Sequence, residues 1–83
     1  MNKAKTHIDL YVISEVRKRR EELNLSQEAL SDRVGYALTF VGERESGVKK
    51  YNLFHLNRLA LALNCSPKDF LPEQPFPDPK VLK

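Results

Sequence analysis

The chain has 83 residues, with 14 Lys plus Arg against 11 Asp plus Glu and a formal net charge of +3. A chain of this length forms one domain with a modest core, which favours a small all-helical fold. The charge suits a polyanionic partner but is far below that of a histone-like coating protein. The single cysteine, Cys65, excludes an internal disulfide framework and is compatible with a reducing compartment, so we expect a cytoplasmic protein.

The apolar runs are too short to cross a membrane. The longest one, at residues 59–63, is far shorter than the roughly 20 residues that a membrane-spanning helix needs. The start of the chain also lacks the charged segment, apolar core and cleavage site of a signal peptide. We therefore expect neither a membrane segment nor a leader.

The first expected helix begins after Thr6, because Thr6 and Asp9 have the spacing of a capping box. It runs to about Leu23, and residues 1–6 before it form a basic tail. The four basic residues at 17–20 point in different directions on a helix, so they do not make one patch. The apolar stripe of this helix comprises Val12, Val16 and Leu23, and it is widened near its start by Leu10, Tyr11 and Ile13.

Two short helices follow, joined by a turn that needs glycine. Ser26 is a good N-cap for the first of them, which ends at Val34 before Gly35. Gly35 can adopt the positive φ of a sharp turn. The second is expected at about residues 38–46, with Thr39 as a substitute cap. This pattern predicts a helix-turn-helix over about residues 26–46, with buried positions at Leu30, Val34 and Val41 and a stop at Gly47.

Two more helices and a proline-rich tail complete the chain. Asn52 caps a helix whose expected core stripe is Leu53, Leu56, Leu59, Ala60 and Leu63. Ser66 and Pro67 then provide a cap and a first-turn proline for a short fifth helix that ends at Leu71. Prolines at 72, 75, 77 and 79 exclude further helix, so residues 72–83 are expected to be extended.

These elements together resemble the Cro/cI-type (XRE-like) helix-turn-helix family of bacterial and phage DNA-binding regulators. The resemblance runs from about Val12 to Leu71, and it implies a compact all-α, five-helix Cro/cI repressor-like domain at residues 7–71. It also implies a transcriptional regulator, a repressor, that binds duplex DNA sequence-specifically as a homodimer. The matching set is Arg20, SQEAL at 26–30, Gly35, Val41, Glu45, Gly47 and LFHLNRLALALNCSPKDFL at 53–71.

The resemblance also implies which residues contact DNA. Gln27 matches the family glutamine that contacts a phosphate. Lys49 and Lys50 lie in the loop where the family contacts the DNA backbone. The base-reading positions are occupied by Leu38, Thr39 and Glu43, with Phe40 and Gly42 beside them. Leucine can pack on a thymine methyl, threonine can donate or accept a hydrogen bond, and glutamate can accept from a cytosine amino group.

This chain departs from the family pattern at three positions of the third helix. Glu43 stands where a long polar or basic residue is usual, and it would be repelled by phosphates. Gly42 costs about 1 kcal/mol relative to alanine; either something approaches the backbone closely there or the cost is tolerated, and we expect tolerance. Arg44 replaces a usually apolar residue. We expect its stem to lie over the first helix with its charge in water, rather than on a phosphate.

Two further expectations concern the scaffold and its assembly. Arg20 matches the family arginine that pairs with the glutamate near the end of the third helix, here Glu45. Phe54 and Leu61 lie seven residues apart, on the side of the fourth helix away from its core stripe, and we expect them at a homodimer interface. The alternative is that the tail covers them within one chain, through Phe76, Val81 and Leu82.

Nothing in the sequence supports catalysis, a cofactor or a metal site. His7 and His55 have no metal-ligand spacing, and no base accompanies Cys65. Two alternatives to a simple repressor stay open. One is an antitoxin that binds a toxin as well as its own operator. The other is a protein-interaction module on the same fold, which is favoured by an apolar and acidic surface comprising Leu38, Phe40, Gly42 and Glu43.

Overall fold

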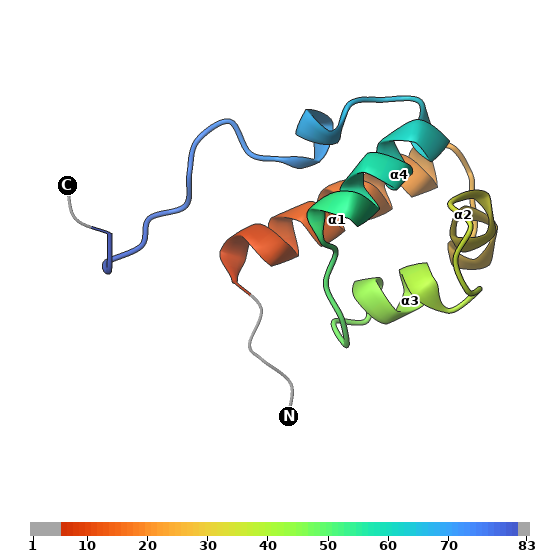
Figure 1. The fold of residues 1–83 in the computed structure, drawn as a ribbon, viewed down its shortest axis with the longest axis horizontal. Coiled ribbons are helices and arrows are strands. Elements are labelled where there is room, and N and C mark those ends of the chain that lie inside the picture. The colour runs from red at the N-terminus through yellow and green to blue at the C-terminus, as the bar shows by residue number, and fades with distance from the viewer. Residues whose placement is uncertain (1–5, 82–83) are drawn as a thin grey trace.

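The computed structural model describes residues 6–81, and these contain four α-helices and one 3₁₀ helix (Figure 1). Residues 1–5 of the expected basic tail, and Leu82, lie outside this part of the chain. No helix within it is long and apolar enough to span a bilayer. The helices in chain order are α1 (His7–Glu22), α2 (Gln27–Arg33), α3 (Phe40–Glu45), α4 (Leu53–Leu63) and η1 (Pro67–Phe70).

Side-chain caps fix where most of the helices begin. The Thr6 hydroxyl accepts a hydrogen bond from the Asp9 amide, and the Asp9 carboxylate accepts one from the Thr6 amide, as a capping box requires. The Ser26 hydroxyl accepts from the Ala29 amide at 3.0 Å. Asn52 accepts from the amide of His55, whose Nδ1 in turn accepts from the Asn52 amide. The capping residues read from the sequence are therefore confirmed for α1, α2 and α4.

The structure corrects two of the expected helices. The α3 helix begins at Phe40, two residues later than expected, and Thr39 makes no side-chain capping bond. The preceding residues form a turn instead, in which the Phe40 amide donates to the Ala37 carbonyl. The fifth expected helix is the 3₁₀ turn η1, because Ser66 and Pro67 start it well but the extended backbone of Leu71 ends it after four residues.

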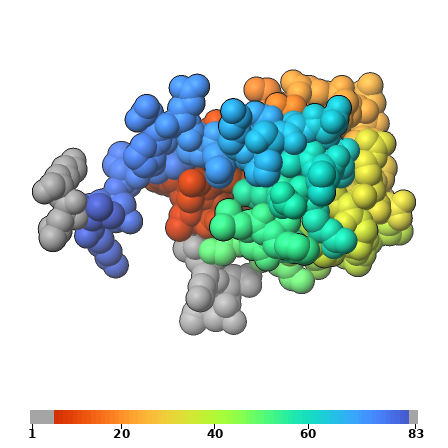
Figure 2. Space-filling model, turned by 45° about the horizontal axis from the view of Figure 1, so that its top comes forward, coloured from red at the N-terminus to blue at the C-terminus, as the bar shows by residue number. Residues whose placement is uncertain are grey.

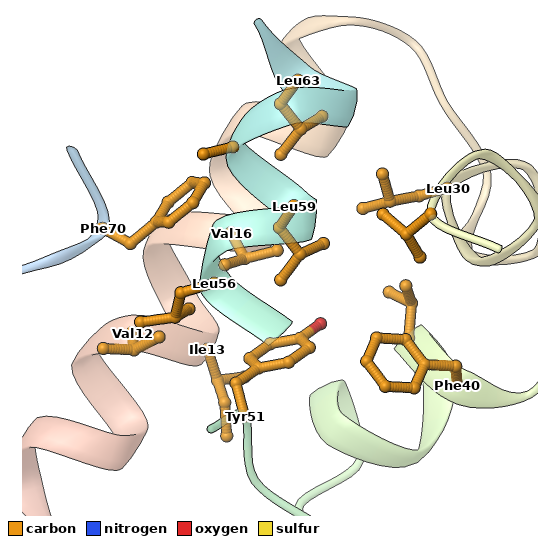
Figure 3. Packing of buried hydrophobic residues seen from close by; sticks show 13 residues of the cluster. Val12, Ile13, Val16, Leu30, Phe40, Tyr51, Leu56, Leu59, Leu63 and Phe70 are labelled. Atoms are coloured by element: carbon orange, nitrogen blue, oxygen red, sulfur yellow. The ribbon is translucent and has the colours of Figure 1, made fainter. Parts of the chain in front are cut away.

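One hydrophobic core joins all five elements (Figure 3). The expected core positions of the helix-turn-helix, Leu30, Val34 and Val41, are buried. Phe70 is fully buried and reaches from η1 toward α1 and α4. Leu23 and Leu53 were expected in the core but are 49% and 80% exposed. Leu23 follows the last turn of α1 and Leu53 is the first residue of α4. Each therefore lies at a helix end, where the apolar face of its helix extends beyond the core.

The proline-rich tail lies along α1, away from Phe54 and Leu61. The ring of Phe76 makes edge contacts with the rings of His7 and Tyr11, at centroid distances of 5.8 and 6.0 Å. Beyond this contact the tail extends away from the packed helices (Figure 2). Val81 is 65% exposed. The alternative in which the tail covers Phe54 and Leu61 is therefore wrong for the described residues.

Candidate nucleic-acid interface

A buried serine holds the two helices of the helix-turn-helix together. Ser31 has no exposed surface, and its hydroxyl donates to the Gln27 carbonyl at 2.8 Å. The same hydroxyl accepts from the Val41 amide at 3.0 Å, across the turn between α2 and α3. Gly35 takes φ +82° in that turn, and Gly47 takes φ +90° after α3. Only glycine adopts these angles at little cost, so the expected glycine roles are confirmed.

The start of α2 and one side of α3 enclose a shallow hollow of about 350 Å³ on the surface. Four of the residues predicted to contact DNA line it, and Leu38 among them is 56% exposed. The hollow thus brings the candidate base-reading positions next to the candidate phosphate contact. Its lining comprises Gln27, Glu28, Leu38, Thr39, Gly42, Glu43 and Ser46.

Phe40 does not belong to this surface. It is 5% exposed, its ring stacks on Tyr36 at 4.3 Å, and it meets His55 edge-on at 4.9 Å. The reason is the helical period, which turns residue 40 to the interior while Thr39 and Glu43 face out. The prediction that Phe40 contacts DNA is therefore wrong. Burial and the charge of Arg44 lower the pKa of His55 in this aromatic cluster.

Arg44 is also buried, contrary to the expectation that its charge lies in water. It is 9% exposed, and its guanidinium lies 4.0 Å from the centroid of the Phe40 ring. Its Nη1 donates to the Phe40 carbonyl at 3.3 Å and lies 3.6 Å from Glu43 Oε1. A cation stacked on an aromatic face is stabilised by the ring quadrupole, so this arginine can replace an apolar residue in the core.

Arg20 and Glu45 form the ion pair that the sequence predicts between α1 and α3. Arg20 Nε donates to Glu45 Oε2 at 2.8 Å, and Nη2 donates to Oε1 at 2.9 Å. The Arg20 and Glu45 side chains are only 10% and 4% exposed. Arg20 Nη1 also donates to the Leu25 carbonyl at 2.7 Å. Hydrogen bonding to Glu45 raises the pKa of Arg20 despite its burial. The pair is bidentate and largely shielded from water.

Gln27 extends this ion pair toward the hollow. Its Nε2 donates to Glu45 Oε1 at 3.0 Å. Its Oε1 lies 3.0 Å from the point that a Cβ on Gly42 would occupy. A group therefore does approach the α3 backbone closely at Gly42, and the expectation that this glycine is merely tolerated is wrong. The sequence holds no signal for this contact, because it depends on how α2 packs on α3.

The two lysines predicted to contact phosphates are outside the lining of the hollow, and each is about half exposed in an ion pair. Lys49 Nζ lies 3.7 Å from Glu43 Oε1, and Lys50 Nζ lies 3.6 Å from Asp9 Oδ2. Burial raises the pKa of Asp9, but hydrogen bonds from Thr6 and the charge of Lys50 outweigh it and lower the pKa overall. Both ammonium groups are on the exposed side of their pairs, and surface pairs contribute under about 1 kcal/mol, so both lysines can exchange partners.

Glu43 lies between two cations, which its sequence position did not indicate. Its carboxylate is 3.6 Å from Arg44 and 3.7 Å from Lys49. These neighbours offset part of the repulsion expected between Glu43 and a phosphate. An acidic side chain on this surface is thus less unfavourable for an anionic partner than the sequence alone implies.

Phe54 and Leu61 are 63% and 77% exposed on the outer side of α4. The guanidinium of Arg58 lies 5.6 Å from the Phe54 ring centroid. Neighbouring large apolar side chains that stay exposed to water are unfavourable, and such a patch often marks a protein interface. This face of α4 is therefore the candidate interface between two copies of the chain.

The candidate metal ligands and the single cysteine can be examined in the structure. Within residues 6–81, no cluster of three or more His, Cys, Asp or Glu side chains is arranged to hold a metal ion. Cys65 is half-buried, and burial raises the pKa of its thiol. Burial thus favours the thiol over the reactive thiolate.

Comparison with known proteins finds relatives for most of the chain. Residues 16–70 match the helix-turn-helix family HTH_3. An uncharacterised helix-turn-helix-type transcriptional regulator, y4aM of Sinorhizobium fredii, is 31% identical over 68 residues. That match covers 82% of this chain and 48% of the relative, so this chain spans about half the length of the curated protein.

Solved structures have the same arrangement of helices. The restriction-modification controller protein C.AhdI of Aeromonas hydrophila is 30% identical, with a TM-score of 0.67 over 74% of this chain and 92% of that one. The P22 c2 repressor, solved in complex with a synthetic operator, is 32% identical, with a TM-score of 0.63 over 72% and 91%. A hypothetical transcription factor from Neisseria, at 21% identity, has a TM-score of 0.73 over 86% of each chain and supports the fold alone.

Proposed function

We propose that this chain, which belongs to the Cro/cI-type helix-turn-helix family, binds duplex DNA through the α2–α3 surface and regulates transcription as a repressor. One observation carries the proposal: Gln27, Leu38, Thr39 and Glu43 line one hollow, on two helices that the buried Ser31 holds together. An α3 helix presented in this way fits the major groove, with Gln27 beside the DNA backbone. The P22 c2 repressor, which binds an operator, supports this arrangement.

The proposal predicts two kinds of response to mutation. Duplex binding should weaken steeply with salt, and Lys49→Ala or Lys50→Ala should each reduce the salt slope by about one phosphate without changing the preferred sequence. Thr39→Ala and Glu43→Ala should change which bases are preferred, because these side chains face the hollow. Selection from a random duplex pool, followed by titrations at several salt concentrations, measures both. Lys80→Ala, in the tail, is the control for losing one exposed lysine.

A second candidate is a protein-interaction module, which includes an antitoxin that binds a toxin. The observation in its favour is that the hollow is lined by Leu38, Glu28 and Glu43 and, within residues 6–81, by no basic residue. An apolar and acidic surface suits a protein partner better than a phosphate. Absence of salt-dependent duplex binding at low ionic strength would favour this candidate over the repressor.

We propose further that the protein acts as a homodimer through the outer face of α4. A two-fold pair would cover Phe54 and Leu61 and would set two α3 helices for successive major grooves, which are about 34 Å apart. Sedimentation should find a dimer for the native chain and a monomer for the Phe54→Ser/Leu61→Ser variant.

A matched control variant tests whether any loss of dimerisation is specific to Phe54 and Leu61 or follows from removing exposed apolar side chains in general. The Leu10→Ser/Leu23→Ser variant also removes two exposed apolar side chains, which are 51% and 49% exposed and belong to α1 and its C-cap. It should stay dimeric. A native chain that is monomeric at high concentration, or a Phe54/Leu61 variant that dimerises unchanged, would show that this interface is wrong.

A further inference from the structure

Chemistry fixes the orientation of the Gln27 amide. The Glu45 carboxylate only accepts hydrogen bonds, so the amide nitrogen and not the amide oxygen must face it. The observed contact, Nε2 to Oε1 at 3.0 Å, has this arrangement. The bidentate bond from Arg20 compensates the charge of Glu45 and holds the carboxylate in place. The Gln27 oxygen is consequently directed against α3.

Gly42 provides the space in which that oxygen lies. A Cβ at this position would be 3.0 Å from Gln27 Oε1 and 3.7 Å from Gln27 Cδ. The first distance is shorter than an ordinary van der Waals contact, so a Cβ at position 42 requires the amide to shift by a few tenths of an ångström. Glycine inside a helix is otherwise unfavourable relative to alanine. The contact with Gln27 therefore gives a reason for a glycine at the centre of the recognition surface.

The amide held in this way keeps one donor available. Gln27 Nε2 carries two N–H groups, and the bond to Glu45 uses one. The second has no partner within residues 6–81. Gln27 is half-buried and lines the hollow, so this donor belongs to the surface that faces DNA under the proposed function.

We infer that Gly42 is a positioning residue, which lets Glu45 and the α3 backbone hold the Gln27 amide so that its second N–H meets a DNA phosphate. This inference rests on the proposed function. A side chain that is already ordered loses less conformational entropy on binding, so the fixed amide contributes more affinity than a mobile one. Gly42 thus acts on DNA through Gln27 and not by touching it.

A double-mutant cycle with the full chain tests this inference, using Gln27→Ala, Gly42→Ala and the double variant on a labelled duplex. Each single variant should raise Kd on the order of tenfold, as expected for losing a hydrogen bond to a charged group. In the Gln27→Ala background, Gly42→Ala should change Kd little. The salt slope should stay at its native value in all three, because no cation is removed. Gln74→Ala makes the same chemical change in the exposed tail and should bind as the native chain does.

Two outcomes would overturn the inference. If the two losses multiply in the double variant, the new Cβ at position 42 acts on DNA directly and not through Gln27. If Gly42→Ala binds as tightly as the native chain, the amide does not need this glycine. Urea unfolding of each variant checks that Gly42→Ala is not less stable than the native chain, which separates lost binding from lost fold.

Measurements on the free protein keep this inference distinguishable from the proposed function. The side-chain amide resonances of Gln27 should move in Gly42→Ala without any DNA present, and those of Gln74 should not. If the native chain binds no duplex, the proposed function fails, and the resonances still report whether Gly42 sets the amide. Unmoved Gln27 resonances would refute the positioning role even where the native chain binds DNA.

Discussion

Replacing Glu45 by alanine is expected to lower the free energy of unfolding by about 3 kcal/mol. The substitution leaves Arg20, whose side chain is only 10% exposed, without its bidentate partner. The bond from Arg20 to the Leu25 carbonyl and the 3.9 Å contact with the exposed Glu21 carboxylate stay, but neither replaces a buried bidentate partner. Gln27 loses its partner in the same variant. Urea unfolding followed by circular dichroism measures the effect.

The matched control for this prediction is Glu21→Ala. Glu21 forms an exposed ion pair with Arg17 at 3.2 Å, with side chains 54% and 57% exposed, and it reaches Arg20 Nη2 only at 3.9 Å, so its loss should cost under about 0.5 kcal/mol. Arg20→Met combined with Glu45→Leu should cost less than Glu45→Ala alone, because it leaves no unpaired buried charge. Equal losses for Glu45→Ala and Glu21→Ala would contradict the account of the pair as buried and structural.

The capping residues and glycines made most of the fold predictable. Thr6, Ser26 and Asn52 act within a few residues of themselves, so their roles can be read from local sequence. Gly35 and Gly47 are likewise predictable, since a positive φ is a local requirement. The Arg20–Glu45 pair spans 25 positions and came from the family resemblance, not from spacing.

The orientation of α3 was the part that local sequence could not supply. This helix has no capping side chain, so its start was misjudged by two residues and Phe40 was expected on the wrong side. The burial of Arg44 depends on the Phe40 ring, and therefore on the same misjudged orientation. The contact between Gln27 and Gly42 arises only when α2 and α3 pack together. Each of these features depends on how α3 packs against the rest of the domain.

The element η1 is a 3₁₀ helix of only four residues, so its position depends on packing against the rest of the domain. Such turns have poorer hydrogen-bond geometry than an α-helix and little stability of their own. Here η1 packs against both α1 and α4, and Asp69 lies 3.6 Å from Arg19 of α1. Phe70, with no exposed surface, is the side chain that η1 contributes to the core (Figure 3). We therefore expect this one ring to anchor the end of the domain.

Replacing Phe70 by alanine is expected to cost about 3–5 kcal/mol, because it removes a fully buried ring and leaves a cavity between three elements. A domain of this length has a total stability of roughly 4–12 kcal/mol, so the variant should lose between about a quarter and all of that stability. Phe70→Leu keeps more of the buried volume and should stay folded with a smaller loss, which urea unfolding can measure. Phe76→Ala makes the same chemical change at a ring that is 39% exposed and should cost under about 1 kcal/mol. If Phe70→Ala and Phe76→Ala prove equally stable, η1 is not part of the cooperative core and the domain ends at α4.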